Sequence, residues 1–237
     1  MKKAYFNWST GKDSALALYK ILKENNYDVG TLVTTVNKQL GKVSMHAIPE
    51  NLLEGQAKSI GLPLYKIYFS EEASMEEYSL AMKESLKILV ENNYRYAVFG
   101  DIFLEDLKKY REEKLAELNL KAVFPLWKRD PKELITEFIS LGFKAITVSV
   151  NANLLDESFV GRVLDENFIN DLPPNVDVCG ENGEFHTFVY DGPIFSYPIK
   201  FSIGEKVLKT YKAGSSNSWD TGFWYCNLVS DKMGELK

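Results

Sequence analysis

AYFNWSTGKDSALALYK, residues 4–20, is the stretch of sequence that decides the fold of this chain. It opens on three apolar residues, 4–6, which suit a buried strand. Small and polar residues follow at 9–14, and the apolar positions after them recur at the spacing of one helical face. These apolar positions are Ala15, Leu18 and Leu22. The stretch therefore predicts a strand, a tight loop and a helix in that order.

The loop at residues 9–14 has the chemistry of an anion-binding site. The first N–H groups of a helix have no partner within it, and the helix dipole adds partial positive charge there. Lys12 adds a point charge, and because it lies in a loop we expect it to contribute little to the core. Asp13 would repel a phosphate unless a divalent cation such as Mg²⁺ lay between them. The hydroxyl groups that can donate to an anion belong to Ser9, Thr10 and Ser14.

This loop differs from the two commonest nucleotide-binding patterns. In G-x-x-x-x-G-K-[ST] the first glycine would fall at Phe6, and the lysine would not be followed by an aspartate such as Asp13. Gly11 stands alone, which excludes G-x-G-x-x-G. A simpler alternative is a surface helix that binds no ligand and is capped by Asp13 or Ser14.

The composition is that of an ordinary soluble globular protein. With 237 residues, 45% of them hydrophobic, the chain can form one large domain or two small ones. The net charge of -5 argues against broad binding to nucleic acid or membrane surfaces. The only cysteines, Cys179 and Cys226, form no C-x-x-C motif, so the pattern indicates no disulfide framework. No long apolar run follows Lys2 and Lys3, so we expect a cytoplasmic protein without a signal peptide or membrane span.

Strand and helix signals alternate through the first half of the chain, which predicts an α/β fold with a Rossmann-like, doubly wound parallel sheet. After the opening stretch, strands are expected at residues 29–36, 64–69, 96–99 and 122–124, and helices at 49–60, 75–89 and 105–119. The mixed charges of the last helix are typical of a solvated face. Ligands of such sheets bind beyond the carboxyl ends of the strands. Three loops are expected there, at residues 9–14, 37–48 and 100–106.

The second half is richer in aromatic residues, glycine and proline. We place a boundary within residues 125–130, giving an N-terminal domain over 1–126 and a smaller C-terminal α/β domain over 127–237. The C-terminal domain is expected to hold helices at 131–141 and 165–171, strands at 144–150, around Phe185 and Val189, at 194–201 and at 224–229, and a loop at 212–220.

Six segments together resemble one family, the diphthine–ammonia ligases of the ATP pyrophosphatase superfamily, whose fold is adenine nucleotide alpha hydrolase-like. The segments are WSTGKDSALAL (8–18), MH (45–46), QAKSIGLP (56–63), FGD (99–101), PLW (125–127) and CGENGEFHTF (179–188). The first resembles the S-G-G-x-D-S pyrophosphate loop of the wider superfamily, with Thr10 in place of the first glycine. The last is the longest and most specific.

This resemblance implies an ATP-dependent reaction in which a carboxylate is adenylated and then amidated with ammonium, releasing AMP and pyrophosphate. The family's substrate is diphthine, a modified histidine side chain of a translation elongation factor. The resemblance also implies that Asp13 and Asp101 hold Mg²⁺, although Asp101 also suits a turn or helix cap after its strand. The residues that would bind ATP are Ser9, Thr10, Gly11, Lys12, Asp13, Ser14, Met45, His46 and Gly100.

The acceptor site is expected in the acidic C-terminal segment. Glu184 and His186 alternate with Phe185, so both can face a cleft while the phenylalanine faces the core. Either could take a proton from the attacking ammonium. The expected substrate residues are Glu181, Glu184, His186 and Thr187, and the expected catalytic set is Lys12, Asp13, Asp101, Glu184 and His186.

Two other functions are compatible with the first loop. An RNA-modifying enzyme of the thiolation or lysidine type would want a reactive cysteine or a basic surface, and neither is visible. A non-catalytic adenine-nucleotide-binding regulator would not need Asp13 or the acidic segment. The sequence leaves the oligomeric state open, and a homodimer is compatible with it.

Overall fold

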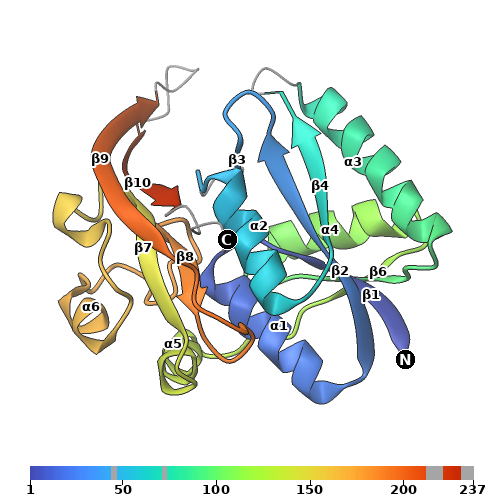
Figure 1. Ribbon diagram of the computed structural model, residues 1–237, viewed down its shortest axis with the longest axis horizontal. Coiled ribbons are helices and arrows are strands. Elements are labelled where there is room, and N and C mark those ends of the chain that lie inside the picture. The colour runs from blue at the N-terminus through green and yellow to red at the C-terminus, as the bar shows by residue number, and fades with distance from the viewer. Residues whose placement is uncertain (44–46, 71–73, 212–220, 231–237) are drawn as a thin grey trace, which may run out of the picture.

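The computed structural model describes residues 1–43, 47–70, 74–211 and 221–230, and it contains two β-sheets (Figure 1). The first sheet is built from the N-terminal half. Its strands are β1 (Lys2–Asn7), β2 (Tyr27–Asn37), β3 (Lys42–Val43), β4 (Leu64–Phe69), β5 (Tyr96–Val98) and β6 (Lys121–Val123). All pair in parallel except β3, which forms a short antiparallel ladder with the end of β2.

The strand order of this sheet reverses beside β1. On one side β1 pairs with β2, which pairs with β4, and on the other side β1 pairs with β5, which pairs with β6. The chain therefore adds β2 and β4 on one side of β1 and then crosses over to add β5 and β6 on its other side. Ligands of such sheets bind at this reversal, beyond the carboxyl ends of the strands. The prediction of a doubly wound parallel sheet is confirmed.

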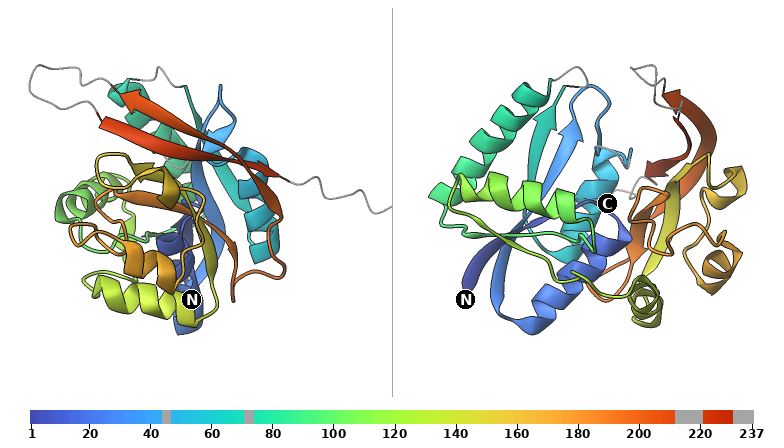
Figure 2. Two further views of the ribbon diagram at one scale, coloured as in Figure 1. Left: turned by 90° about the vertical axis from the view of Figure 1, so that its left-hand side faces the viewer. Right: turned by 180° about the vertical axis from the view of Figure 1, so that it is seen from behind.

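Helices cover both faces of the first sheet (Figures 1 and 2). They are α1 (Lys12–Glu24), α2 (Glu50–Ile60), α3 (Met75–Glu91) and α4 (Glu105–Ala116). α1 and α2 lie between the two sheets, and α3 and α4 cover the opposite face. Successive side chains of β1 point to opposite faces of the sheet and so belong to two separate hydrophobic clusters. Ala4 and Phe6 pack on the α1 side, whereas Tyr5 packs with Leu86 and Leu89 of α3.

The expected apolar face of α1 is wrong at one position. Ala15 and Leu18 are fully buried, but Leu22 is 42% exposed and Ile21 is buried instead. Ile21 and Leu22 lie three and four residues after Leu18, and both spacings place a side chain near the same helical face. Periodicity alone could not choose between them.

The second sheet is antiparallel and belongs to the C-terminal half. Its strands pair in the order β8-β7-β10-β9, and β7 is flanked by helices on the outer side. The elements are α5 (Pro131–Ser140), β7 (Lys144–Asn151), the short helix η1 (Glu157–Phe159), α6 (Glu166–Asp171), β8 (Phe185–Asp191), β9 (Phe201–Tyr211) and β10 (Thr221–Ser230).

The strand expected at 194–201 is wrong, because residues 192–200 have no regular structure and β9 begins at Phe201. Pro193 and Pro198 lack the N–H group that a strand ladder needs, which favours an irregular connection. The strands expected at 144–150 and 224–229 are confirmed as β7 and β10. The loop expected at 212–220 lies outside the described residues.

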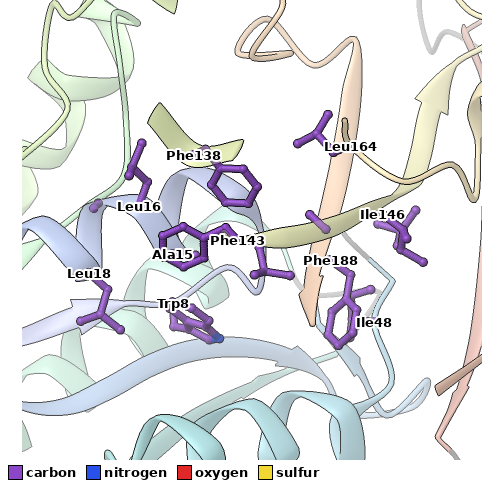
Figure 3. Packing of buried hydrophobic residues seen from close by; sticks show 14 of the residues in the cluster. Trp8, Ala15, Leu16, Leu18, Ile48, Phe138, Phe143, Ile146, Leu164 and Phe188 are labelled. Carbon is purple, nitrogen blue, oxygen red and sulfur yellow. The ribbon is translucent and has the colours of Figure 1, made fainter. Parts of the chain in front are cut away.

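One hydrophobic core runs between the two sheets. Trp8, which follows β1, Leu18 of α1 and Phe188 of β8 belong to the same buried cluster (Figure 3). The predicted boundary between residues 126 and 127 falls in the connection from β6 to α5, and it stays a prediction. Within the described part of the chain, no helix has the length and apolar character needed to cross a membrane.

The close packing of Gly100 on α1 gives a test of the fold. A Cβ atom at Gly100 would lie 2.9 Å from the backbone carbonyl carbon of Asp13 and 2.9 Å from the backbone nitrogen of Ser14. We expect Gly100→Ala to lower the free energy of unfolding by about 1–3 kcal/mol, measured by urea denaturation, because backbone must move.

Gly55→Ala is the matched control, because Gly55 lies within α2 and its nearest neighbour, Ile199 Cγ2, would be 3.7 Å from the added atom. Alanine favours a helix over glycine, so this variant should be as stable as the parent or more so. Equal stability of the two variants would contradict the close approach.

Candidate functional site

The loop between β1 and α1 leaves the N-terminus of α1 open to an anion, because no side chain caps it. Gly11 is the N-cap residue, with extended backbone and no side-chain cap. Asp13 and Ser14 lie in the first turn, so the alternative in which one of them caps the helix is wrong. Thr10 has a φ of 73°, in the left-handed region that glycine adopts without strain.

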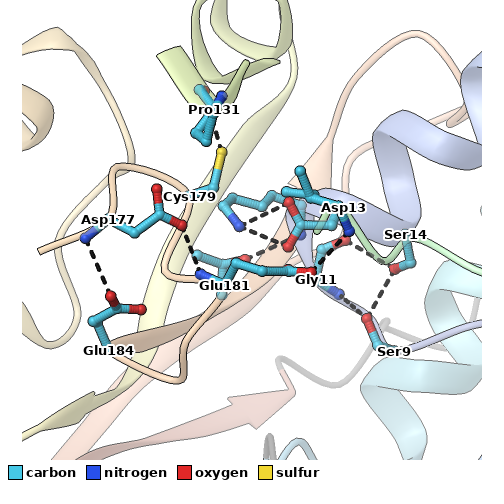
Figure 4. Close-up of polar contacts among 12 residues, drawn as sticks. Ser9, Gly11, Asp13, Ser14, Pro131, Asp177, Cys179, Glu181 and Glu184 are labelled. Atoms are coloured by element: carbon cyan, nitrogen blue, oxygen red, sulfur yellow. Dashed lines mark hydrogen bonds and ion pairs between the residues drawn. The ribbon is translucent and has the colours of Figure 1, made fainter. Parts of the chain in front are cut away.

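Hydroxyl groups hold this loop together. Ser9 Oγ donates to Ser14 Oγ at 3.0 Å, and Ser14 Oγ donates to the carbonyl of Gly11 at 2.9 Å (Figure 4). The N–H of Gly11 approaches Ser9 Oγ at 3.4 Å. The two serines are therefore within reach of one another across the loop, at the amino end of α1.

Lys12 and Asp13 form the central ion pair of the site. Lys12 Nζ lies 2.6 Å and 2.8 Å from the two carboxylate oxygens. Lys12 is only 4% exposed, so the expectation that it contributes little to the core is wrong: β8 covers it, and Phe185 lies beneath its ammonium group. Burial lowers the pKa of Lys12, but Asp13, Cys179 and Glu181 together raise it above its ordinary value. Burial raises the pKa of Asp13, which Lys12 only partly offsets.

Asp101 enters the site from the end of β5. It is paired with Arg111 of α4, whose Nε lies 2.8 Å from Oδ2 and whose guanidinium packs over Phe99. Asp101 still faces the other acids, because its charge contributes to the raised pKa values of Asp13 and Glu181. The structure thus brings Asp101 beside the loop and gives it a cationic partner.

The segment before β8 closes over this end of the sheet. Glu181 Oε1 accepts from the backbone N–H of Ile102 at 2.8 Å, which ties the segment to the loop after β5. Burial raises the pKa of Glu181 to about 7. The hydrogen bond from the Ile102 N–H lowers this pKa, and the negative charge of Asp13 raises it. Asp177 accepts from the N–H of Glu181 at 3.0 Å and also raises the pKa of Asp13.

Glu184 lies within its own loop. Its carboxylate accepts from the backbone N–H group of Asp177 at 3.2 Å (Figure 4). It also accepts from the backbone N–H group of Asn182 at 2.9 Å and from the side-chain amide of Asn182 at 3.0 Å. The residue is 4% exposed. These contacts show a carboxylate that organises the turn before β8.

The other two expected acceptor residues lie on β8 itself. Thr187 Oγ1 accepts from the backbone N–H of Lys12 at 3.0 Å, so it contacts the loop before α1. Burial lowers the pKa of His186 to about 4, and the charge of Lys12 adds to that effect. Met45 and His46 lie outside the described residues.

Sequence reasoning missed Arg111 and Asp177 as residues of this site. Arg111 lies in a helix whose mixed charges indicated a solvated face, so no signal marked it. Asp177 precedes the 179–188 motif by two residues, and that proximity was a usable signal. Cys179 is buried: its thiol donates to the carbonyl of Pro131 at 3.3 Å, and burial raises its pKa to about 12.

Among the described residues no three His, Cys, Asp or Glu side chains are grouped so that they could hold a metal by themselves. What the geometry does provide is a helix N-terminus, a buried lysine and several carboxylates at the reversal of a parallel sheet. This combination is typical of α/β enzymes that bind phosphorylated ligands.

Comparison with known proteins names the family. The model described as diphthamide synthase N-terminal domain matches residues 1–122, and the one described as diphthamide synthase C-terminal domain matches residues 130–223. The diphthine–ammonia ligases of Rattus norvegicus and Homo sapiens are 27% and 26% identical over 229 residues, which is 86% of this chain and 85% of each relative. That of Danio rerio is 32% identical over 64% of this chain and 66% of its own length.

The chain therefore belongs to the diphthamide synthase family, a family of ATP-dependent, amide-forming ligases. This confirms the family that the motifs predicted. A solved structure described as a predicted subunit of tRNA methyltransferase from Methanocaldococcus jannaschii is 22% identical, with a TM-score of 0.43 over 62% of this chain and 80% of that one. So distant a likeness says nothing of function.

The lowered pKa of His186 predicts a contribution to acid sensitivity. Its value of about 4, against 6.5 for an unperturbed histidine, means that between these pH values the unfolded chain binds more protons than the folded one. The contribution of His186 to the free energy of unfolding therefore falls by about 3 kcal/mol as the pH drops from 6.5 to 4.

His186→Gln should remove most of this loss. The measurement is urea denaturation of parent and variant at pH 7, where the histidine is neutral in both states, and at pH 4.5. An equal loss of stability on acidification in both proteins would show that His186 is not the group responsible.

Proposed function

We propose that this chain is a diphthine–ammonia ligase that uses ATP to activate the diphthine carboxylate and ammonium to amidate it. The observation that carries the proposal is the loop before α1, in which a helix N-terminus, Lys12 and Asp13 meet at the sheet reversal. Its chemistry suits the triphosphate of ATP, and the diphthamide synthase models match both halves of the chain.

Two bond exchanges make up the reaction. A carboxylate oxygen of the acceptor attacks the α-phosphorus of ATP, and the bond to pyrophosphate breaks. Ammonia then attacks the carboxyl carbon, AMP leaves, and the proton lost from ammonium passes to a base. Activation is needed because a free carboxylate would have to expel oxide. The loop N–H groups and Lys12 stabilise negative charge on the departing pyrophosphate.

The carboxylates fit a magnesium ion that ATP brings with it. Mg²⁺ at nucleotide sites is usually held by one or two protein carboxylates together with the phosphates. Asp13, whose side chain is 30% exposed, and Asp101 would hold it here. The ion would neutralise phosphate charge beside these acids.

Glu181 is better placed as the base than the residues that the sequence favoured. Glu184 accepts from three N–H donors within its own turn, and the low pKa of His186 makes it a weak base. Glu181 has a pKa of about 7 and lies beside Asp13 and Ile102. A base whose pKa is near the working pH is the most effective at neutral pH.

The thiolation alternative receives no support from the cysteines. Cys179 and Cys226 are buried, and burial raises the pKa of each thiol. Thiolate chemistry needs an accessible cysteine of low pKa.

Binding of ATP at the loop is tested by Lys12→Met. Loss of the ammonium group should weaken ATP binding at least tenfold, measured by calorimetric titration. Lys20→Met is the control, because Lys20 also lies in α1 and also forms a 2.6 Å ion pair, with Glu137, but away from the loop. The parent should convert ATP to AMP and pyrophosphate with the diphthine-bearing factor and ammonium; ADP and phosphate as products would contradict the proposal.

The division of roles between the two glutamates is tested by a matched pair. Glu184→Gln puts an amide donor against the N–H groups of its turn and should lower the free energy of unfolding by about 1–3 kcal/mol. Glu181→Gln should leave ATP binding and stability nearly unchanged but slow amidation with ammonium at least tenfold.

Hydroxylamine, a neutral nucleophile at pH 7, needs no base and should restore turnover of the Glu181→Gln enzyme. If ammonium is used at the parental rate by this variant, the base must be sought elsewhere.

A further inference from the structure

A buried amide joins the nucleotide loop to the C-terminal sheet. Gln56 is fully buried, and its helix α2 lies between the two sheets (Figure 1). Its Oε1 accepts from the indole N–H of Trp8 at 2.9 Å. Its Nε2 donates to the carbonyl of Thr10 at 3.1 Å and to the carbonyl of Val189 at 2.6 Å. One side chain thus contacts Trp8, just after β1, the loop at Thr10 and β8 at Val189.

The orientation of this amide is fixed by chemistry. An indole N–H can only donate, so the oxygen of Gln56 must face Trp8, and both amide hydrogens must face the two carbonyls. Each N–H hydrogen of the side chain therefore has a partner. A buried polar group that is fully paired fixes the position of everything it contacts.

The contact at Thr10 falls where the loop is strained. Thr10 adopts a φ of 73°, which is unfavourable for a threonine because of its Cβ atom. Such a conformation persists only where its surroundings enforce it. Its carbonyl accepts from Gln56 Nε2 and, at 3.0 Å, from the N–H of Val189. Both donors come from outside the loop, and the next residue, Gly11, is the N-cap of α1.

We propose that Gln56 is a positioning residue for the ATP loop. It holds Thr10 in the left-handed conformation that presents the start of α1 to phosphate, and it makes this conformation depend on the C-terminal sheet through Val189. The inference rests on the proposed function in taking ATP as the ligand. Gln56 acts through Thr10 and does not itself touch the reacting atoms.

The test compares Gln56→Met with Ser59→Ala. Methionine keeps the length of the side chain and loses its hydrogen bonds. Ser59 lies one turn further along α2, is fully buried, and also binds the C-terminal half, donating to the carbonyl of Tyr197 at 2.5 Å and accepting from its N–H at 3.1 Å. Its bonds do not reach the loop, so Ser59→Ala reports the cost of losing a buried contact between the halves.

Gln56→Met should raise the Kd for ATP at least tenfold and speed amide hydrogen exchange at residues 9–14 at least tenfold relative to the amides of β4. Ser59→Ala should change neither, whatever it does to Tm. Adding Thr10→Gly to Gln56→Met should recover part of the lost affinity, because glycine adopts a positive φ without strain. A merely structural contact would give no such rescue.

Parental ATP affinity and parental loop exchange in Gln56→Met would overturn the inference, as would equal effects of Ser59→Ala. If Gln56→Met does not fold, Trp8→Phe takes its place, because loss of the indole donor releases the amide and should change affinity and exchange in the same direction. Hydrogen exchange needs no nucleotide. Failure of the parent to bind ATP would therefore defeat the proposed function, while the exchange data still decide the role of Gln56.

Discussion

The approach of β8 to the loop before α1 is the contact on which the rest of the structure depends. Val189 donates its N–H to the carbonyl of Thr10, and Thr187 accepts from the N–H of Lys12. These bonds lie between the two sheets, where an unpaired polar group would be costly. A strand from the C-terminal half thus completes the backbone of a loop in the N-terminal half. The site is composite, and neither half contains all of it.

The contact between β8 and the loop also brings several acidic side chains close together, and their mutual repulsion would by itself weaken the fold. Asp13 and Glu181 both have raised pKa values, chiefly because they are buried, and the negative charge of Asp13 further raises the pKa of Glu181. Asp101 and Asp177 add to the same field. Lys12 offsets part of the repulsion, but the group stays rich in carboxylates, and perturbed carboxylates in one place are typical of catalytic sites. Cations that accompany a nucleotide would relieve the repulsion.

The sequence predicted the parallel sheet well because its signals are local. Apolar runs, Pro49 at the start of α2 and Gly61 at its end all act within a few residues. The errors came where distant packing decides. Ile21 is buried in place of Leu22 because of what covers α1. The strand β9 could not be located because none of residues 201–210 is buried, and Ile203 and Leu208 are both exposed. The loop chemistry was predictable, but the pairing of Asp101 with Arg111 was not, since ten residues separate them and a helical charge pattern hides the pair.

The two glutamates of the CGENGEFHTF motif show what a motif can and cannot say. Both are acids in one short segment, and spacing alone treats them alike. The positive φ of Gly180 and Gly183 turns the chain so that Glu184 meets the N–H groups of its own turn and Glu181 meets Ile102 across the sheets. One motif is expected to contain both kinds of residue when a tight turn must place a single side chain in the site: some residues stabilise the turn, and one points toward the site. The turn needs its own carboxylate to satisfy buried N–H groups. The acid that points toward the candidate site should therefore be the one with charged neighbours outside the turn. Here that residue is Glu181, whose pKa is affected by Asp13, Lys12 and Asp101.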